Sequence, residues 1–275
     1  MNNINKIVLI TGASSGMGRA AVEFLSEHGF TVYAGTRDLT NLADIQDDNI
    51  IPISLDITCQ NSIDKSIKII YDKHKKIDVL INNAGYGLVS TVEDMQEQEM
   101  FNQYNINVFG LLRVSKAVIP IMRKQKSGII INISSFLGKI GLPLLTLYNS
   151  SKYAVEGITD SMRYELKNFN IRVHSILPGF FDTKFARDNL ATNLETFDND
   201  SPYSKLVQTL APVIVEQINN GDNAQEVAEM IMKIISDNEF PARATIGEKA
   251  KKFLPMRKEL SDEDFERRVR EYYNL

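Results

Sequence analysis

Six short apolar runs, rich in Ile and Val, recur between residues 7 and 176, and segments with helical spacing separate them. The runs are Ile7–Ile10, Thr31–Ala34, Ile50–Ser54, Val79–Ile81, Ile129–Ile133 and Arg172–Ile176. Such runs are typical of strands buried on both faces. Because parallel neighbours need a crossover of about a dozen residues or more, the alternation indicates parallel strands joined by helices. The sequence therefore predicts an α/β fold with a doubly wound parallel sheet flanked by helices.

The rest of the chain adds to this pattern without suggesting a second domain. No internal repeat or flexible linker is present, so we expect one domain over residues 1–275. Residues 184–222 are polar, rich in Asn and Asp, and include Pro202 and Pro212, which predicts a substrate-loop insertion over the site. A helical segment at Ala224–Ser236 precedes a last strand at Arg243–Gly247. The charged tail, 248–275, has apolar residues at helical spacing and predicts an amphipathic helix.

Charge and composition exclude several classes of protein. The net charge is −4 and the pI is about 5.5, so no basic field is available for nucleic acid. The opening MNNINKIVLI is too short for a signal-peptide core or a membrane span, so we expect a cytoplasmic protein without stable membrane insertion. Cys59 is the single cysteine, and His28, His74 and His174 are widely scattered, so no metal site is expected.

A glycine-rich turn directly follows the first predicted strand. It reads Thr11-Gly12-Ala13-Ser14-Ser15-Gly16-Met17-Gly18 and leads into helix-forming residues. Glycines allow a tight turn and let a phosphate approach the backbone at a helix N-terminus. The alternative is a simple loop, but the strand before the turn and the helix after it favour a dinucleotide site, although the spacing G-x-x-x-G-x-G differs from the usual fingerprint.

Polar residues follow the next three predicted strands. Arg37 comes after the second strand, and its guanidinium suits a 2′-phosphate, which favours NADP(H); a plain surface charge is the alternative, and the adjacent Asp38 weakens the inference. Asp56 follows the third strand and Asn82-Asn83-Ala84-Gly85 the fourth. Each of these could simply stabilise a turn, but open α/β sheets bind ligands at this edge.

Tyr148 and Lys152 lie four residues apart in a predicted helix, Thr146–Lys167. This spacing places both side chains on one face. A nearby ammonium favours the phenolate and would lower the tyrosine pKa from about 10 towards the working range. Ser135 ends the strand Ile129–Ile133 and could bond the oxygen whose charge changes during reaction, with Ser134 as the adjacent alternative.

These motifs together resemble the short-chain dehydrogenase/reductase family. The matching segments are TGASSGMG, NNAG, the Asn in NINVFG, the Ser in NISS, YNSSK and PGFFDT, in order between residues 6 and 184. The resemblance implies a Rossmann-type fold in which Tyr148 is the general acid/base and Ser135 binds the reacting oxygen. It also implies that Lys152 holds the nicotinamide ribose and lowers the tyrosine pKa, and that Asn107 supports a water relay.

The same resemblance implies a set of cofactor contacts in addition to Arg37, Tyr148 and Lys152. Gly12, Ser14, Gly16 and Gly18 would line the phosphates, Asp56 and Ile57 would meet adenine, Asn83 would lie near the ribose, and Pro178, Gly179 and Thr183 would face nicotinamide. Further expected cofactor contacts are Ser15, Met17, Ala84 and Gly85. The implied reaction is hydride transfer between NADP(H), or NAD(H), and an alcohol or carbonyl compound.

The substrate is expected to be bulky and apolar, as in members of the family that act on steroid- or retinoid-like compounds. Apolar residues near the expected pocket are Leu142, Leu144, Leu145, Phe180, Phe181, Phe185, Phe197 and Tyr203, although core packing explains many of them equally well. The alternatives are a protein that senses NADP(H) without turnover and, less favoured, an epimerase or dehydratase. By resemblance we also expect a homodimer or homotetramer.

Overall fold

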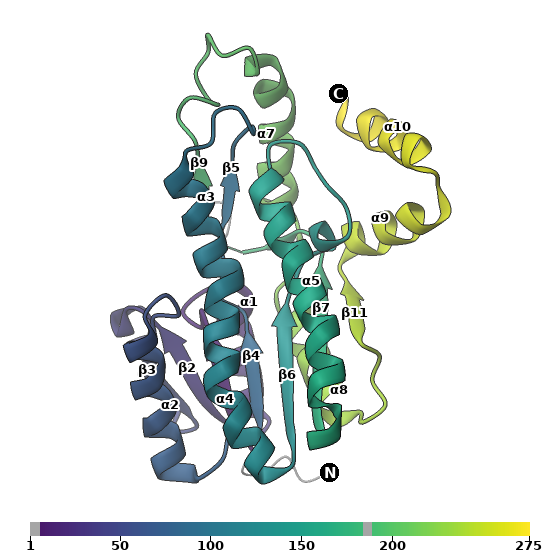
Figure 1. Cartoon of the computed structure of the whole chain (residues 1–275). Coiled ribbons are helices and arrows are strands. Elements are labelled where there is room, and N and C mark those ends of the chain that lie inside the picture. The colour runs from purple at the N-terminus through teal and green to yellow at the C-terminus, as the bar shows by residue number, and fades with distance from the viewer. Residues whose placement is uncertain (1–5, 184–188) are drawn as a thin grey trace.

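Seven parallel strands form the central sheet, in the order β11-β7-β6-β4-β1-β2-β3 (Figure 1). The computed structural model describes residues 6–183 and 189–275. The strands are β1 (Ile7–Thr11), β2 (Thr31–Thr36), β3 (Ile50–Ser54), β4 (Val79–Asn82), β6 (Gly128–Ile133), β7 (Ile171–Pro178) and β11 (Arg243–Ile246). Every neighbouring pair in this sheet is parallel, and the strand order reverses between β1 and β4. The predicted doubly wound α/β fold is therefore confirmed.

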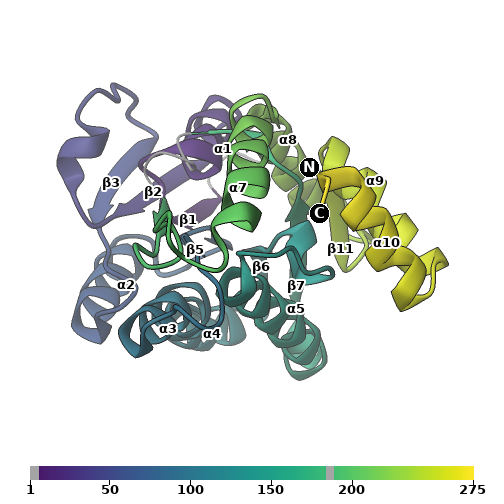
Figure 2. The same cartoon turned by 90° about the horizontal axis from the view of Figure 1, so that it is seen from above.

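Helices cover both faces of the sheet (Figure 2). On one face lie α1 (Gly16–Glu27) and α8 (Gln225–Ser236), and on the other lie α2 (Gln60–His74), α4 (Leu111–Gln125) and α5 (Thr146–Leu166). Alternate residues of each strand point to opposite faces. Val8 and Ile10 of β1 thus pack in the α1 and α8 core, whereas Leu9 packs in the other. Both faces are apolar, which explains the unbroken Ile and Val runs.

One long helix crosses from the core to the region above the sheet. It consists of α3 (Glu97–Tyr104), the π-helical turn η2 (Asn105–Gly110) and α4. By length and hydropathy alone the stretch Glu97–Gln125 is long enough to cross a membrane, but nearly half of its most apolar window is buried within the protein. Val114, Val118 and Met122 of α4 are fully buried in the sheet core. This helix therefore packs as a core element.

Residues 189–223 contain two short strands and one helix, joined by turns. Strand β9 (Leu190–Thr192) pairs with β5 (Gly87–Val89), helix α7 (Ser204–Asn219) follows, and β10 (Asp222–Asn223) pairs with β8 (Phe181–Asp182). The polar composition of this part of the chain does not predict helix α7, and Pro212 lies inside the helix. Its buried residues, Val207, Leu210, Ile214 and Ile218, nevertheless follow a helical spacing. Residues 184–188 of the predicted insertion, including Phe185, lie outside the described residues.

The C-terminal tail forms two helices, α9 (Glu248–Glu259) and α10 (Asp262–Tyr273). Ser261 caps α10 by accepting a hydrogen bond from the backbone N–H of Asp264, 3.1 Å away. Phe253 of α9 packs on Phe136, with ring centroids 6.3 Å apart, and on Tyr272 at 5.2 Å. Phe136 begins the short helix η3 (Phe136–Gly138), so the tail rests on the segment that follows β6.

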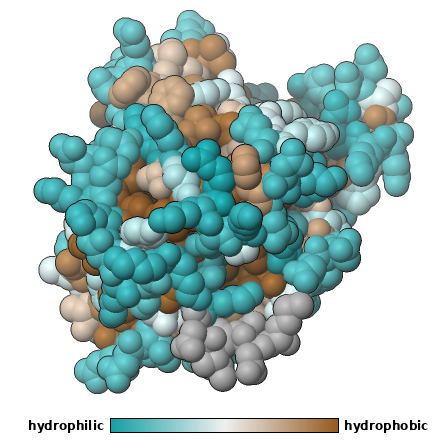
Figure 3. Space-filling view, turned by 60° about the horizontal axis from the view of Figure 1, so that its bottom comes forward, coloured by the Kyte–Doolittle hydropathy of each residue, from teal (hydrophilic) through white to brown (hydrophobic). Residues whose placement is uncertain are grey.

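The remaining short elements are η1 (Leu39–Leu42), after β2, and η4 (Lys167–Phe169), after α5. The face of the molecule shown in Figure 3 is mainly hydrophilic, with hydrophobic side chains in small areas between polar ones.

Candidate active site

The glycine turn between β1 and α1 has the backbone shape that a phosphate site needs. Gly12 and Gly16 have positive φ angles of +63° and +54°, which residues with a side chain rarely adopt. A Cβ atom on Gly18 would lie 2.3 Å from the Gly12 carbonyl oxygen and 2.4 Å from Asn83 Nδ2. Ser15 makes no side-chain cap, and the first turn of α1 carries no acidic residue. The positive end of α1 is therefore suited to an anion, and this cradle fits a pyrophosphate.

Asn83 stabilises this turn through hydrogen bonds to its backbone. Its Nδ2 donates to the carbonyl oxygens of Thr11, at 3.1 Å, and of Gly12, at 2.9 Å. Thr11 Oγ1 accepts in return from the backbone N–H groups of Asn83 and Ala84, both at 3.0 Å. Sequence reasoning missed Thr11, although a polar residue at the end of a buried strand is a usable signal. The turns after β1 and β4 are thus one hydrogen-bonded unit.

Arg37 and Asp38 follow the end of β2, and the structure gives Asp38 a local role in the turn. The Asp38 carboxylate caps η1: its Oδ1 accepts from Thr40 N at 3.0 Å and from Thr40 Oγ1 at 2.7 Å. These bonds lower the pKa of Asp38. Arg37 is exposed immediately after the buried Thr36. The acidic residue that weakened the NADP(H) inference is thus occupied with its own turn.

Asp56 also forms a turn at the end of β3, the simpler of the two alternatives that the sequence allowed. Its Oδ1 accepts from Thr58 N at 2.8 Å and from Thr58 Oγ1 at 2.7 Å. The next residue, Ile57, is buried, and its Cδ1 would lie 2.5 Å from a Cβ on Gly110. The expected adenine end therefore packs directly against η2.

The loop after β7 brings the expected nicotinamide end beside the glycine turn. Pro178 ends β7, and the N–H of Gly179 donates to the Ile246 carbonyl at 2.9 Å. A Cβ on Gly16 would lie 3.3 Å from Thr183 Cβ. Segments more than 160 residues apart in the sequence therefore meet at this edge of the sheet.

Ser135 and Tyr148 meet at the end of β6. Ser135 caps η3 by accepting from Leu137 N at 3.1 Å, and its hydroxyl is hydrogen-bonded to the Tyr148 phenol. Ser134 Oγ instead lies 2.9 Å from the position of a Cβ on Gly138, and within the described residues it is buried without a hydrogen-bond partner. The structure therefore places Ser135, and not Ser134, beside the tyrosine.

Burial dominates the acid–base properties of the pair. It raises the pKa of Tyr148 to about 12, although the Ser135 hydrogen bond acts in the opposite direction. The net shift is thus opposite to the one expected from the Lys152 charge, because desolvation of the phenolate outweighs other effects. Burial also lowers the pKa of Lys152 to about 8, and the Glu156 carboxylate opposes this shift. Lys152 Nζ donates to the Ile133 carbonyl at 2.8 Å and lies 5.7 Å from the centre of the Tyr148 ring.

Asn107 lies in the π-helical turn, and its side chain is used structurally. Its Oδ1 accepts from Tyr86 N at 3.0 Å, and its Nδ2 donates to the Tyr86 carbonyl at 2.9 Å and to Ser151 Oγ at 3.0 Å. A Cβ on Gly85 would lie 3.2 Å from Asn107 Oδ1 and 3.8 Å from Lys152 Nζ. The structure thus brings Asn107, Gly85 and Lys152 together. A π-helical turn such as the one that holds Asn107 is frequently found at a functional site.

Most of the apolar residues assigned to the pocket belong to the core. Leu142, Leu144, Leu145 and Phe180 are buried in the cluster formed with α7, α9 and α10, and Phe181 is buried in the core on the α1 and α8 face of the sheet. Phe197 is 36% exposed, and Tyr203 donates from its hydroxyl to Glu93 Oε2 at 2.6 Å. Core packing therefore accounts for five of the seven that are described.

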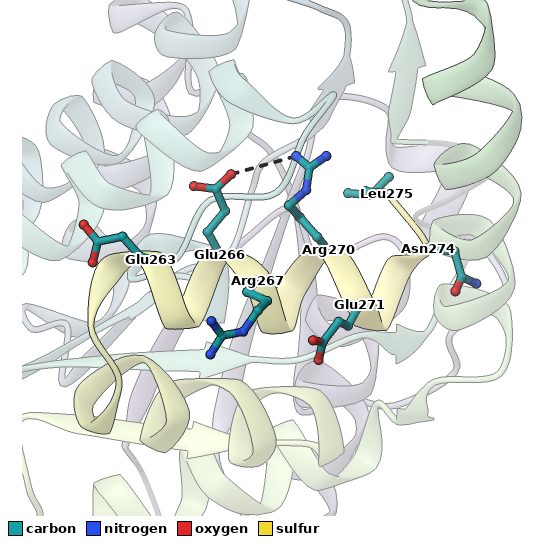
Figure 4. A pocket seen from close by; sticks show the side chains of 7 residues that line it. All are labelled: Glu263, Glu266, Arg267, Arg270, Glu271, Asn274 and Leu275. Carbon is teal, nitrogen blue, oxygen red and sulfur yellow. Dashed lines mark ion pairs between the residues drawn. The ribbon is translucent and has the colours of Figure 1, made fainter.

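A hollow lies on α10, away from this site (Figure 4). Its volume is about 390 Å³, and every lining residue belongs to α10 or to the two residues that follow it. Most of these side chains are charged, and Arg270 pairs with Glu266 at 3.8 Å. No three His, Cys, Asp or Glu side chains gather as a metal site within residues 6–183 and 189–275.

Comparison with known proteins agrees with this geometry. Residues 6–194 match the family model described as short chain dehydrogenase. The chain belongs to the short chain dehydrogenase family. It is 35% identical, over 91% of its length and 93% of the relative's, to a 3-ketodihydrosphingosine reductase from Bacteroides thetaiotaomicron. It is 33% identical to oxidoreductase BOA17 from Botryotinia fuckeliana, over 89% of each chain.

Solved structures of the family superpose along nearly the whole chain. A short-chain dehydrogenase from Streptomyces avermitilis has a TM-score of 0.83 at 29% identity and covers 98% of this chain and 96% of its own. One from Burkholderia cenocepacia, in complex with NADP, has a TM-score of 0.77 at 25% identity and covers 98% and 99%. The comparisons therefore support an oxidoreductase of the short chain dehydrogenase family.

Proposed function

We propose that this short chain dehydrogenase uses NADP(H) to interconvert a ketone and a secondary alcohol on a bulky, mainly apolar substrate. The observation that carries the proposal is the hydrogen-bonded pair of the buried Ser135 and the partly buried Tyr148, with Lys152 one helical turn further along α5. A protein that only senses NADP(H) has no need of this arrangement, so the non-catalytic alternative is not favoured.

The side chains can perform the proton chemistry of ketone reduction. NADPH, when bound, supplies the hydride that adds to the carbonyl carbon. Tyr148 gives its phenolic proton to the carbonyl oxygen, and Ser135 donates a hydrogen bond to that oxygen as its negative charge develops. The raised pKa of Tyr148 keeps the phenol protonated at neutral pH, which suits an acid. Lys152, with a pKa of about 8, is mostly protonated there and stabilises the resulting phenolate.

The residues at the end of β2 support NADP(H) over NAD(H). Arg37 is exposed, and its planar guanidinium can bind a 2′-phosphate with two hydrogen bonds. Oδ1 of the Asp38 carboxylate accepts both polar hydrogens of Thr40, so this oxygen is committed to the turn rather than to a ribose 2′-hydroxyl. The solved relative from Burkholderia cenocepacia holds NADP.

The substrate class follows from the relatives and from the segment beside β5. The Bacteroides relative is named for a ketone on a long alkyl chain, and we propose a similar long-chain ketone here. Leu194 is 85% exposed and Phe197 is 36% exposed in the segment after β9, where they could contact such a chain.

The test compares NADPH and NADH binding by nicotinamide fluorescence in the wild type, Arg37→Ala and Arg268→Ala. Arg268 is exposed on α10 and serves as the matched control. We expect Arg37→Ala to weaken NADPH binding about tenfold, a loss of about 1.4 kcal/mol, without changing NADH binding. Turnover is then measured on ketones of increasing chain length, including 3-ketodihydrosphingosine. Equal binding of both cofactors by the wild type would contradict the NADP(H) proposal, and no turnover on any ketone would contradict the reaction.

We also propose that the protein is a homodimer or homotetramer that pairs through the helix α3–α4 and α5. These helices expose large apolar side chains, including Phe101 at 53%, Tyr153 at 47% and Tyr164 at 83%. Exposed apolar groups of this kind favour association. Sedimentation as a monomer at micromolar concentration would contradict this proposal.

A further inference from the structure

Three polar side chains follow one face of the continuous helix α3–η2. They are Glu99, Gln103 and Asn107, and their spacing of four residues places them one above the other. We propose that Gln103 is a positioning residue, which holds residues 189–197, called here the substrate segment, in a fixed place relative to Asn107 and Lys152. This inference rests on the proposed function, because it assumes that the segment contacts the substrate.

Gln103 is fully buried, and both ends of its amide bind backbone. Nε2 donates to the Tyr86 carbonyl at 2.7 Å, and Oε1 accepts from Leu88 N at 2.9 Å. The Tyr86 carbonyl also accepts from Asn107 Nδ2 at 2.9 Å. The two amides thus clamp the same stretch of chain, which a single apolar side chain cannot do. Both hydrogen-bonding atoms of this buried amide bind one backbone segment. This indicates that the position of that segment matters.

The clamped stretch joins the catalytic residues to the substrate segment. At one end is Gly85, next to Asn107 and Lys152. At the other end is β5, which pairs with β9 in the register Gly87 to Leu190. The N–H of Gly87 donates to the Asn189 carbonyl at 2.9 Å. A shift of Tyr86–Leu88 would therefore move β9 with it.

The upper end of the polar face holds the substrate segment directly. Asn193 Nδ2 donates to Glu99 Oε2 at 2.9 Å and to the Asp94 carbonyl at 3.1 Å, and Asn193 N donates to the Val89 carbonyl at 3.0 Å. Asn193 is 2% exposed, although it lies between exposed residues. Glu99, Gln103 and Asn107 therefore contact, in order, the substrate segment, β5 and the catalytic helix α5.

The active-site motifs of the sequence give no role to Gln103, because it lies in a stretch of polar residues, QEQEMFNQYN, that looks like a solvated helix. Gln98, five residues earlier in α3, is exposed. Among the described residues its side chain bonds only to Asn102 of the same helix. The pair Gln98 and Gln103 thus offers the same substitution at an exposed and at a buried position of one helix.

The experiment replaces Gln103 with methionine, which fills a similar volume but cannot bind the backbone, and uses Gln98→Met as the control. We expect Gln103→Met to raise the KM for the long-chain ketone about tenfold, while the Kd for NADPH changes less than twofold and the pH profile of kcat is unchanged. Gln98→Met should leave all three values unchanged. A purely structural role would lower the melting temperature and leave KM unaffected in the folded protein, and that result would overturn the proposal.

Asn193→Ala provides a second variant if Gln103→Met fails to fold. It releases the same segment from its upper contact, so we expect a similar rise in KM. In the double variant the KM should rise less than the product of the two single effects, because both act on one segment. Independent, multiplicative effects would contradict a shared role.

Hydrogen exchange separates failure of this inference from failure of the proposed function. We expect Gln103→Met to speed amide exchange at least tenfold in peptides covering 86–90 and 189–197, and Gln98→Met to leave these peptides unchanged. This result needs no substrate. If the wild type reduces no ketone but exchange accelerates in both segments, the proposed function fails and the coupling remains. If exchange accelerates only in 86–90, the coupling fails.

Discussion

The two ends of the proposed active site are built in different ways. At the glycine turn the backbone forms the proposed cofactor cradle, and the side chains of Thr11 and Asn83 hydrogen-bond to that backbone. At the end of β6 and the start of α5 the proposed reactive groups are side chains, and the backbone binds them; the Ile133 carbonyl, for instance, accepts from Lys152. Substitutions at the first end should change binding and stability, whereas substitutions at the second should change the chemical step.

The largest effect is expected from Tyr148→Phe, which removes the proton donor and keeps the ring. General acid–base groups contribute about 10²- to 10⁴-fold, so kcat should fall roughly a thousandfold. NADPH binding should change far less than kcat, because the glycine turn is not touched. Steady-state kinetics and fluorescence titration measure the two quantities. The control is Tyr153→Phe, a half-exposed tyrosine five residues further along α5. Equal losses in both variants would mean that the comparison between the two ends does not hold.

Gly18→Ala tests the other end. The new methyl group would lie 2.3 Å from the Gly12 carbonyl oxygen, so the turn has to shift. Overpacking of this kind costs about 1–3 kcal/mol of unfolding free energy, and we expect NADPH binding to weaken with it. Urea denaturation and cofactor titration measure both.

Gly157→Ala in α5 is the matched control for that change. A Cβ at this position meets nothing within 4 Å, so alanine should stabilise the helix by about 0.5–1 kcal/mol. Destabilisation at Gly157 would instead indicate that a second subunit covers this face of α5.

Lys152→Met should remove turnover but stabilise the protein by about 1–2 kcal/mol at pH 7, because a buried charge is costly. The folded-state pKa of Lys152 is about 8, below the ordinary value of 10.5. Between these values the unfolded chain binds more protons than the folded protein, so wild-type stability rises with pH. The advantage of the methionine variant should therefore shrink between pH 8 and 10. Denaturation curves at pH 7, 8.5 and 10 measure it, and a constant difference would contradict the lowered pKa.

The two ends also differed in how far the sequence predicted them. The glycine pattern and the buried strands have a local cause, so the sheet and the predicted helix Thr146–Lys167, observed as Thr146–Leu166, could be read directly. The positive φ angles of Gly12 and Gly16 agree with the same local cause. The choice of Ser135 over Ser134 depends instead on which hydroxyl is hydrogen-bonded to the Tyr148 phenol, and this is a property of the folded chain.

Three features could not be predicted for physical reasons. The pKa of Tyr148 depends mainly on burial by segments that are distant in the sequence. The expected lowering of this pKa by the Lys152 charge is therefore not the dominant effect. Helix α7 hides its four buried apolar positions in a polar stretch with an internal proline. Gln103 binds strand β5, which has only three residues and is too short to give a pattern. Each of these depends on contacts between residues far apart in the sequence.

The contact between Phe253 and Phe136 has a consequence for protein engineering. Phe136 directly follows Ser135, so the tail supports the segment that carries the hydroxyl proposed to bind the substrate oxygen, and it does so from outside the motif-bearing part of the chain. A mutant library aimed at new ketones would therefore gain from randomising positions along α9 together with the pocket. Changes there can adjust the orientation of Ser135 by small steps, without altering any residue that takes part in the reaction.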